Sequence, residues 1–152
     1  MKRTIGAIFA LVVLAGMLVL AIISKNRVPA VHASPGCTVA TLTGNYGFVS
    51  INSFFSRTST SRFLPSGDVG LITFDGGGNL STTFTDSANG SITTFTAIPG
   101  TYTVNSDCTG STTLTGPGFT VHIQMVIVNG GTEVLSMITD PGSTSTFDLK
   151  KQ

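Results

Sequence analysis

The chain has 152 residues, of which 10% are charged and 41% hydrophobic, with 18 glycines and no tryptophan. This length is typical of a single domain, and the charged fraction is far below the roughly 25% usual in globular proteins. After residue 33 the chain carries seven acidic and four basic residues, a net charge of −3. No basic patch remains that could follow a phosphate backbone, which argues against nucleic acid as a partner.

The N-terminal segment is apolar. An uncharged run of 19 residues covers 5–23, two basic residues precede it, and small or aliphatic side chains end at Ala33. We interpret residues 1–33 as an export signal cleaved after Ala33. The alternative is an uncleaved N-terminal membrane anchor, because the run is long enough to span a bilayer as a hydrophobic helix. Both interpretations place the domain outside the cytoplasm: secreted, periplasmic or at the cell surface, with residues 5–23 as its one membrane contact.

Residues 34–152 have the pattern of a single all-β domain. Short runs rich in Thr, Val, Ile and Phe alternate with turn sequences at 75–79, 87–90, 99–100, 106–110, 116–118, 129–131 and 140–142. Gly, Asn and Asp suit such turns because they tolerate positive φ. We therefore predict an antiparallel meander of eight to nine strands. It closes into a small barrel, since closure removes exposed strand edges; a β-sandwich is the alternative.

Alternation along the strands predicts which side chains face the interior. In residues 119–129 apolar side chains occupy every second position, and His122 lies on the opposite, polar face. A barrel of eight strands has room for its own side chains or for one small ligand. The candidate ligand-binding residues on the inner face are Tyr46, Phe48, Phe84, Tyr102, Met125 and Met137.

One segment interrupts this rhythm. Residues 52–67 are too long for a hairpin turn and contain three phenylalanines beside Arg57 and Arg62. We expect a loop whose phenylalanines pack on the barrel rim, with a lid over one end as the alternative.

The two cysteines, Cys37 and Cys108, are expected to form one disulfide, because an even number in an exported domain is typical of a structural bridge. The bridge would connect the segment before the first strand to the turn at 106–110. Closing a loop of this length restricts the unfolded chain by about 4 kcal/mol in the entropy model.

Three motifs carry a resemblance to known proteins. "LTGNYGF" (42–48), "GDVGLITFDGGGNLS" (67–81) and "GTYTVNSDCTG" (100–110) resemble segments of small exported bacterial proteins without an assigned function, which implies a β-barrel domain. Residues 44–46 also resemble the Gly-x-Trp of lipocalins and other calycins, with tyrosine in place of tryptophan. In that family an arginine on a late strand stacks on the tryptophan, and here only Lys150 or Lys151 could take its place. In size and strand count the chain is similar to the allene oxide cyclase and dirigent-type barrels.

Catalytic groups are sparse. His122 is the one histidine after residue 33, and no spacing gives it a partner or a nucleophile. Asp68, Asp75, Asp86, Asp107 and Asp140 fall in or beside expected turns, where Asp caps its own backbone. Two carboxylates could still meet across a barrel mouth as an acid–base pair. No metal site and no cofactor is predicted, and 75–79 is expected to be a hairpin turn.

The preferred hypothesis is a non-enzymatic exported barrel that binds a small apolar or amphipathic ligand. The first alternative is a structural or surface-interaction domain with a solid core. The second is a cyclase or isomerase that works through a hydrophobic pocket with few catalytic groups.

Overall fold

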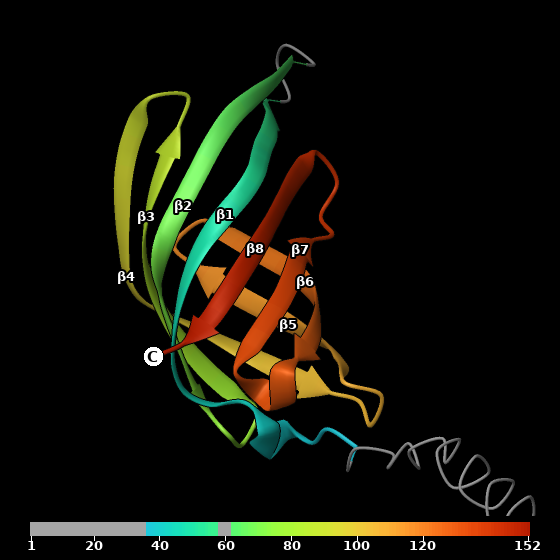
Figure 1. Cartoon of the computed structure of the whole chain (residues 1–152). Helices are drawn as coiled ribbons and strands as arrows, with labels where there is room; N and C mark the ends of the chain where they lie inside the picture. The colour runs from blue at the N-terminus through green and yellow to red at the C-terminus, as the bar shows by residue number, and fades with distance from the viewer. Residues whose placement is uncertain (1–35, 58–61) are drawn as a thin grey trace, which may run out of the picture. The chain divides into compact units, whose positions relative to one another are not determined.

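The computed structural model describes residues 36–57 and 62–152 (Figure 1). Eight antiparallel strands follow one another in chain order, and pairing of the last strand with the first closes the barrel. The strands are β1 (Thr43–Arg57), β2 (Arg62–Asp75), β3 (Asn79–Ala88), β4 (Ser91–Val104), β5 (Thr109–Gly116), β6 (Phe119–Val128), β7 (Glu133–Ile138) and β8 (Ser143–Lys151). Two short 3₁₀ helices accompany them, η1 (Val39–Thr41) and η2 (Asn129–Gly131). The predicted all-β meander is confirmed, and it forms a barrel, not a sandwich.

The predicted N-terminal hydrophobic helix, with the export signal or anchor to which it would belong, lies outside the described residues. In the part of the chain that the structure describes, no helix is long and apolar enough to cross a membrane. The division of the chain after residue 33 stays a prediction.

Two hairpin turns are confirmed. Asn89 and Gly90, with φ of 50° and 86°, connect β3 to β4, as expected for an Asn-Gly turn. Between β2 and β3, the Asp75 carboxylate accepts hydrogen bonds from the backbone N–H groups of Gly77 at 2.7 Å and Asn79 at 2.9 Å. Asp75 therefore caps a hairpin, as the sequence predicted.

The predicted turn at residues 99–100 is wrong. β4 continues through Pro99 and Gly100 and stays paired with β3 there. The register shifts by one residue near Ala97, which has φ of 52°. Such a bulge bends a strand and lets proline occupy a position where the hydrogen-bond ladder is already irregular. Two expected strands are thus one bent strand.

Residues 52–57 and 62–67 are strand, not loop. β1 continues to Arg57 after a bulge at Asn52, with φ of 53°, and pairs with the start of β2. Phe54 and Phe63 point into solvent, with 42% and 62% exposure. In Figure 1 the hairpins of β1–β2 and β3–β4 extend further than β5 to β8, so one side of the barrel wall is taller.

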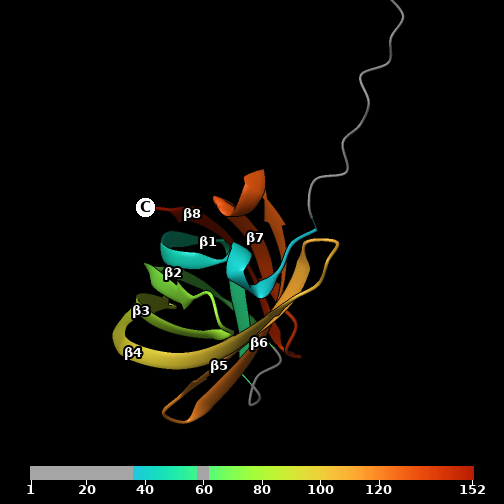
Figure 2. The same ribbon diagram turned by 90° about the horizontal axis from the view of Figure 1, so that it is seen from below.

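A packed layer, which we call the floor, closes one end of the barrel. It contains Leu42, Tyr46, Phe74 and Tyr102, all at most 4% exposed. The ring of Phe74 meets Tyr46 and Tyr102 edge-on, with centroids 5.3 and 5.0 Å apart. The Tyr102 hydroxyl donates to the carbonyl of Leu42 at 2.9 Å, and that of Tyr46 donates to the carbonyl of Gly131. η1 lies across this end (Figure 2).

Two further contacts hold the floor. Cys37 and Cys108 form the predicted disulfide, with Cα atoms 4.9 Å apart, and so connect the segment before η1 to the β4–β5 turn. The Nζ atom of Lys151 lies 5.8 Å from the centroid of the Tyr46 ring. Of the two lysines near the end of the chain, Lys151 is thus the one that lies over the Tyr46 ring.

Candidate functional site

A cavity of about 140 Å³ lies between the floor and the opposite end of the barrel, which we call the mouth. Its lining is almost entirely apolar and includes Phe48, Phe84, Met125 and Phe147, with Asp68 among the few polar members. The cavity is not sealed from solvent, and its one charged lining residue, Asp68, is half-buried near the mouth. For scale, an apolar cavity of about 150 Å³ in another protein holds one benzene molecule.

The candidate residues fall into three groups. Phe48, Phe84 and Met125 line the cavity. Tyr46 and Tyr102 are buried, but they belong to the floor and do not border the cavity. Their hydroxyls are committed to backbone carbonyls, so their role in the structure is to close the barrel.

Met137 does not face the interior. Its side chain is 48% exposed on the outer face of β7, next to Leu135, which is also 48% exposed. Val134, Ser136 and Ile138 line the cavity instead. Both faces of this strand carry apolar residues, so alternation alone could not identify the inner one.

Five phenylalanines form a continuous series of ring contacts, which we call the phenylalanine arc. They are Phe147, Phe48, Phe84, Phe95 and Phe119, from β8, β1, β3, β4 and β6. Successive centroids are 5.9, 6.4, 4.9 and 5.3 Å apart. Aromatic pairs at such distances are favourable beyond their buried area. Four of the five rings border the cavity.

Two carboxyl groups meet near the mouth. Asp68 on β2 and Asp86 on β3 are directly opposite each other in the register, so their carboxyl groups are cross-strand neighbours. The backbone N–H of Asp68 donates to Ser50 Oγ at 2.6 Å. These residues, the carboxyl pair, lie within strands. The prediction that Asp68 and Asp86 cap turns is therefore wrong.

The carboxyl pair has perturbed acidity. Burial, and then the charge of Asp86, raise the pKa of Asp68 to about 6 from 3.8, while a hydrogen bond from Ser50 opposes the rise. Burial also raises the pKa of Asp86, and its hydrogen bond with Asp68 opposes that shift. Neighbouring carboxyls in a partly apolar site resist double ionisation. Asp68 thus keeps its proton to a higher pH than an isolated aspartate does.

Two other polar groups of the lining are satisfied by the wall itself. The hydroxyl of Thr82 donates to the carbonyl of Leu71 at 3.0 Å, and that of Thr112 contacts the sulfur of Met125 at 3.7 Å. Among the lining side chains, Asp68 is the one that carries charge.

His122 lies on the outer wall. Its Nδ1 is 2.7 Å from an oxygen of Asp140, whose other oxygen accepts the His122 backbone N–H at 2.6 Å. These hydrogen bonds, the backbone one first, lower the pKa of Asp140. The His122 side chain is 57% exposed and is not part of the cavity lining.

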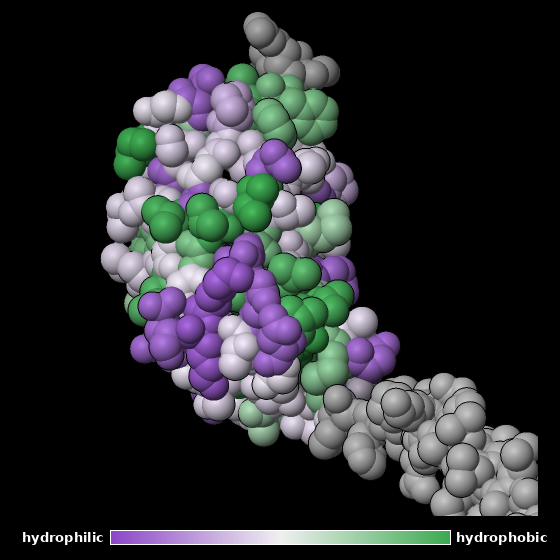
Figure 3. Space-filling model, viewed as in Figure 1, coloured by the Kyte–Doolittle hydropathy of each residue, from purple (hydrophilic) through white to green (hydrophobic). Residues whose placement is uncertain are grey.

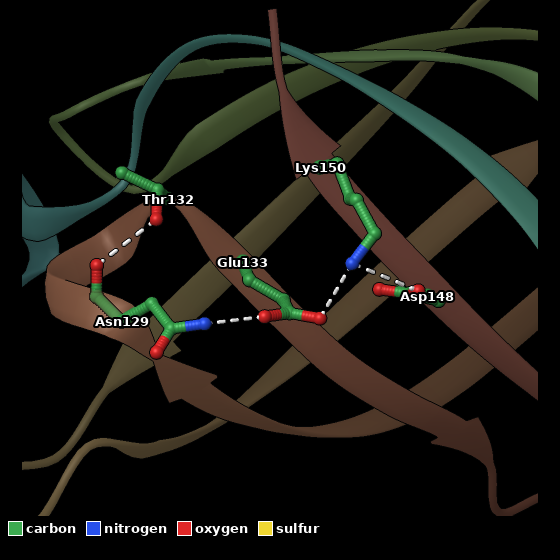
Figure 4. Close-up of polar contacts among 5 residues, drawn as sticks. All are labelled: Asn129, Thr132, Glu133, Asp148 and Lys150. Carbon is green, nitrogen blue, oxygen red and sulfur yellow. Dashed lines mark hydrogen bonds and ion pairs between the residues drawn. The ribbon is translucent and has the colours of Figure 1, made fainter.

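A second polar cluster lies on β7 and β8, also outside the barrel (Figure 4). Lys150 Nζ is 2.7 Å from Glu133 and 3.2 Å from Asp148, and the Asn129 amide donates to Glu133. The hydrogen bond from Lys150 is the main cause that lowers the pKa of Glu133. Glu133 therefore acts here as a partner for lysine and does not join the carboxyl pair.

The outer wall has two kinds of surface. On β3 to β5 it carries hydroxyl pairs across strands, such as Thr85 with Thr94 and Thr103 with Ser111. On the face shown in Figure 3, exposed apolar side chains gather over β1, β2 and β7. They are Val49, Ile51, Val69, Leu71, Leu135 and Met137. Hydroxyl-bearing side chains thus cover only part of the barrel exterior.

Within the described residues, no group of three or more His, Cys, Asp or Glu side chains is placed to hold a metal ion. No family model, no curated protein and no solved structure matches the chain. The closed meander is consistent with a calycin-like barrel.

Proposed function

We propose that the chain is exported and that its barrel binds one small, largely apolar molecule in the cavity. The observation that carries this proposal is the cavity of about 140 Å³ above a closed floor, lined mainly by apolar side chains and reaching solvent at the mouth. Apolar pockets with a few placed polar groups are the usual form of small-molecule sites.

The cavity gives less support to the alternative of a structural domain with a solid core. Protein interiors normally contain few voids larger than a water molecule. A barrel with a purely structural role could fill the space with larger side chains at Val121 or Ser136, both of which line it.

Export is supported by the disulfide between Cys37 and Cys108, because such bridges are typical of oxidising compartments outside the cytoplasm. The predicted signal in residues 1–33 agrees with this location.

The test is uptake of benzene or toluene by the protein purified after expression of the full chain, measured by calorimetry and by NMR shifts of cavity methyl groups. Val121→Phe, which fills the cavity from β6, should abolish uptake. Val126→Phe is the matched control, because Val126 lies on the outer face of the same strand with 45% exposure. The proposal is wrong if the parent protein takes up neither probe, or if both variants behave alike.

A second candidate is a pocket-type isomerase, favoured by one observation. The pKa of Asp68 is raised to about 6 by burial and by Asp86, close to the range in which a carboxylate works as a general base near neutral pH. A base of this kind should exchange the α-hydrogens of a small cyclic ketone with deuterium from D₂O. Exchange that is no faster with the parent protein than with Asp68→Asn would exclude this candidate.

A further inference from the structure

We infer that the cavity selects a molecule with a protonated amine on a small apolar body, with the amine against Asp68 and Asp86 and the apolar body inside. This inference rests on the proposed ligand-binding function and names the chemical class of its ligand. It depends on three features of the site: the position of the carboxyl pair, the aromatic rings around it, and the volume behind it.

The carboxyl pair has no cationic partner among the side chains that the structure describes. Lys150 is paired with Glu133 and Asp148, Lys151 lies over Tyr46 at the floor, and His122 is bound to Asp140 outside the barrel. Asp68 borders the cavity and Asp86 is its cross-strand neighbour, so a ligand cation is the natural complement of the pair.

The surroundings of the pair also suit an ammonium group. Phe48 and Phe84 belong to the phenylalanine arc and occupy the strands that carry Ser50 and Asp86. Phe84 comes two positions before Asp86 in β3, so both side chains are on the same face of the sheet. Aromatic faces attract cations, most strongly where water is partly excluded. Carboxylates with aromatic rings form a better site for an amine than for a neutral hydroxyl.

The volume limits the apolar body. About 140 Å³ is close to the space that holds one benzene ring, so a single six-membered ring or a chain of similar volume fits. The one charged residue of the lining, Asp68, borders the cavity near the mouth. A ligand with one charged end should therefore enter with its apolar end first and keep its amine at the mouth.

Protonation of the pair should control this preference. The groups that face Asp68 from neighbouring strands are Ser50 and Phe48 on β1 and Asp86 and Phe84 on β3, and Thr93 on β4 is opposite Asp86. Asp86 is the one titratable group among them. Below pH 6 Asp68 gains a proton, the pair loses negative charge, and the advantage of a cationic ligand should decrease.

The experiment compares benzylamine, benzyl alcohol and benzoate by calorimetry with the protein from full-chain expression. At pH 7.5 benzylamine should bind about tenfold more tightly than benzyl alcohol, because a hydrogen bond to a charged group is stronger than a neutral one. Benzoate should bind most weakly. At pH 5 the preference for the amine should fall to about twofold or less.

Variants separate this inference from the proposed function. Asp68→Asn and Asp86→Asn should each remove most of the amine preference, measured within each variant as the ratio of the affinities for benzylamine and benzyl alcohol. Asp140→Asn, which removes a carboxylate from the outer wall, should leave the preference intact. If one variant fails to fold, the other variant and the comparison of pH 7.5 with pH 5 on the parent protein still test the inference. Equal binding of amine and alcohol overturns the inference and leaves the proposed function standing, whereas binding of neither overturns both.

Discussion

Asp68→Asn tests the electrostatics of the carboxyl pair through stability. The pKa of Asp68 is raised by burial and by Asp86 to about 6, from 3.8 in the absence of these effects. The folded state therefore binds a proton more tightly than the unfolded state. The resulting stabilisation is complete below about pH 4 and is lost as the pH rises through about 6. At neutral pH the ionised carboxyl lowers the free energy of unfolding.

The size of this effect follows from the two pKa values. The difference between about 6 and 3.8 corresponds to about 3 kcal/mol if the group is fully shielded. Asp68 is only half-buried, so solvent screening reduces the expected effect to about 1 to 2 kcal/mol. Asparagine has nearly the same shape and does not ionise. The variant should therefore be more stable than the parent protein at pH 7 by about this amount.

Urea unfolding at intervals from pH 4 to pH 8, with the disulfide intact, measures the prediction. The difference between the urea midpoints of Asp68→Asn and the parent protein should grow in favour of the variant by about 1 M from pH 4 to pH 8. Asp140→Asn is the matched control of opposite sign, since hydrogen bonds from His122 lower the pKa of Asp140. A difference between Asp68→Asn and the parent protein that does not change with pH would refute the reasoning. So would a variant that is less stable at pH 7.

Three further predictions concern the framework. Replacing Cys37 and Cys108 together by alanine should lower the free energy of unfolding by about 4 kcal/mol in urea titrations, whereas an equal stability of the two forms would contradict the bridge. Gly70→Ala should destabilise the fold by about 1 to 3 kcal/mol, because the new Cβ would come within 2.4 Å of a backbone oxygen. Gly67→Ala is the control, because a Cβ there would have no atom within 4 Å. Thermal melts should show it nearly as stable as the parent protein. Tyr102→Phe removes a hydroxyl that donates to the carbonyls of Val39 and Leu42, and it should lower the free energy of unfolding by about 1 kcal/mol in the same thermal melts. If the stability does not change, packing alone closes the floor.

The fold was largely predictable from local signals. Turn residues such as Asn89 and Gly90 adopt positive φ, and alternation in β6 places an apolar residue at every second position from Phe119 to Ile127. β7 could not be oriented because Val134 and Leu135 are equally apolar. Pro99 was misread because a bulge two residues earlier makes proline acceptable inside a strand.

The candidate site was less predictable. Of the six residues that alternation predicted for the lining, three border the cavity: Phe48, Phe84 and Met125. The carboxyl pair was not, because Asp68 follows a glycine and Asp86 precedes a turn sequence, which suggested capping. Their proximity depends on the register between β2 and β3. The register between two strands depends on the whole hairpin, so it cannot be predicted from the identity of one residue.

The position of the described chain ends has a practical consequence. Gly36 lies against Ser106, next to the disulfide, and Gln152 donates its backbone N–H to Asn45 at 2.9 Å, beside the floor. Both ends are therefore on the side of the barrel opposite the mouth. A linker fused after Gln152 could immobilise the protein on a sensor surface with its mouth facing the solution. A circular permutant could join Gln152 to the segment before Cys37 and open the chain elsewhere without crossing the path of a ligand.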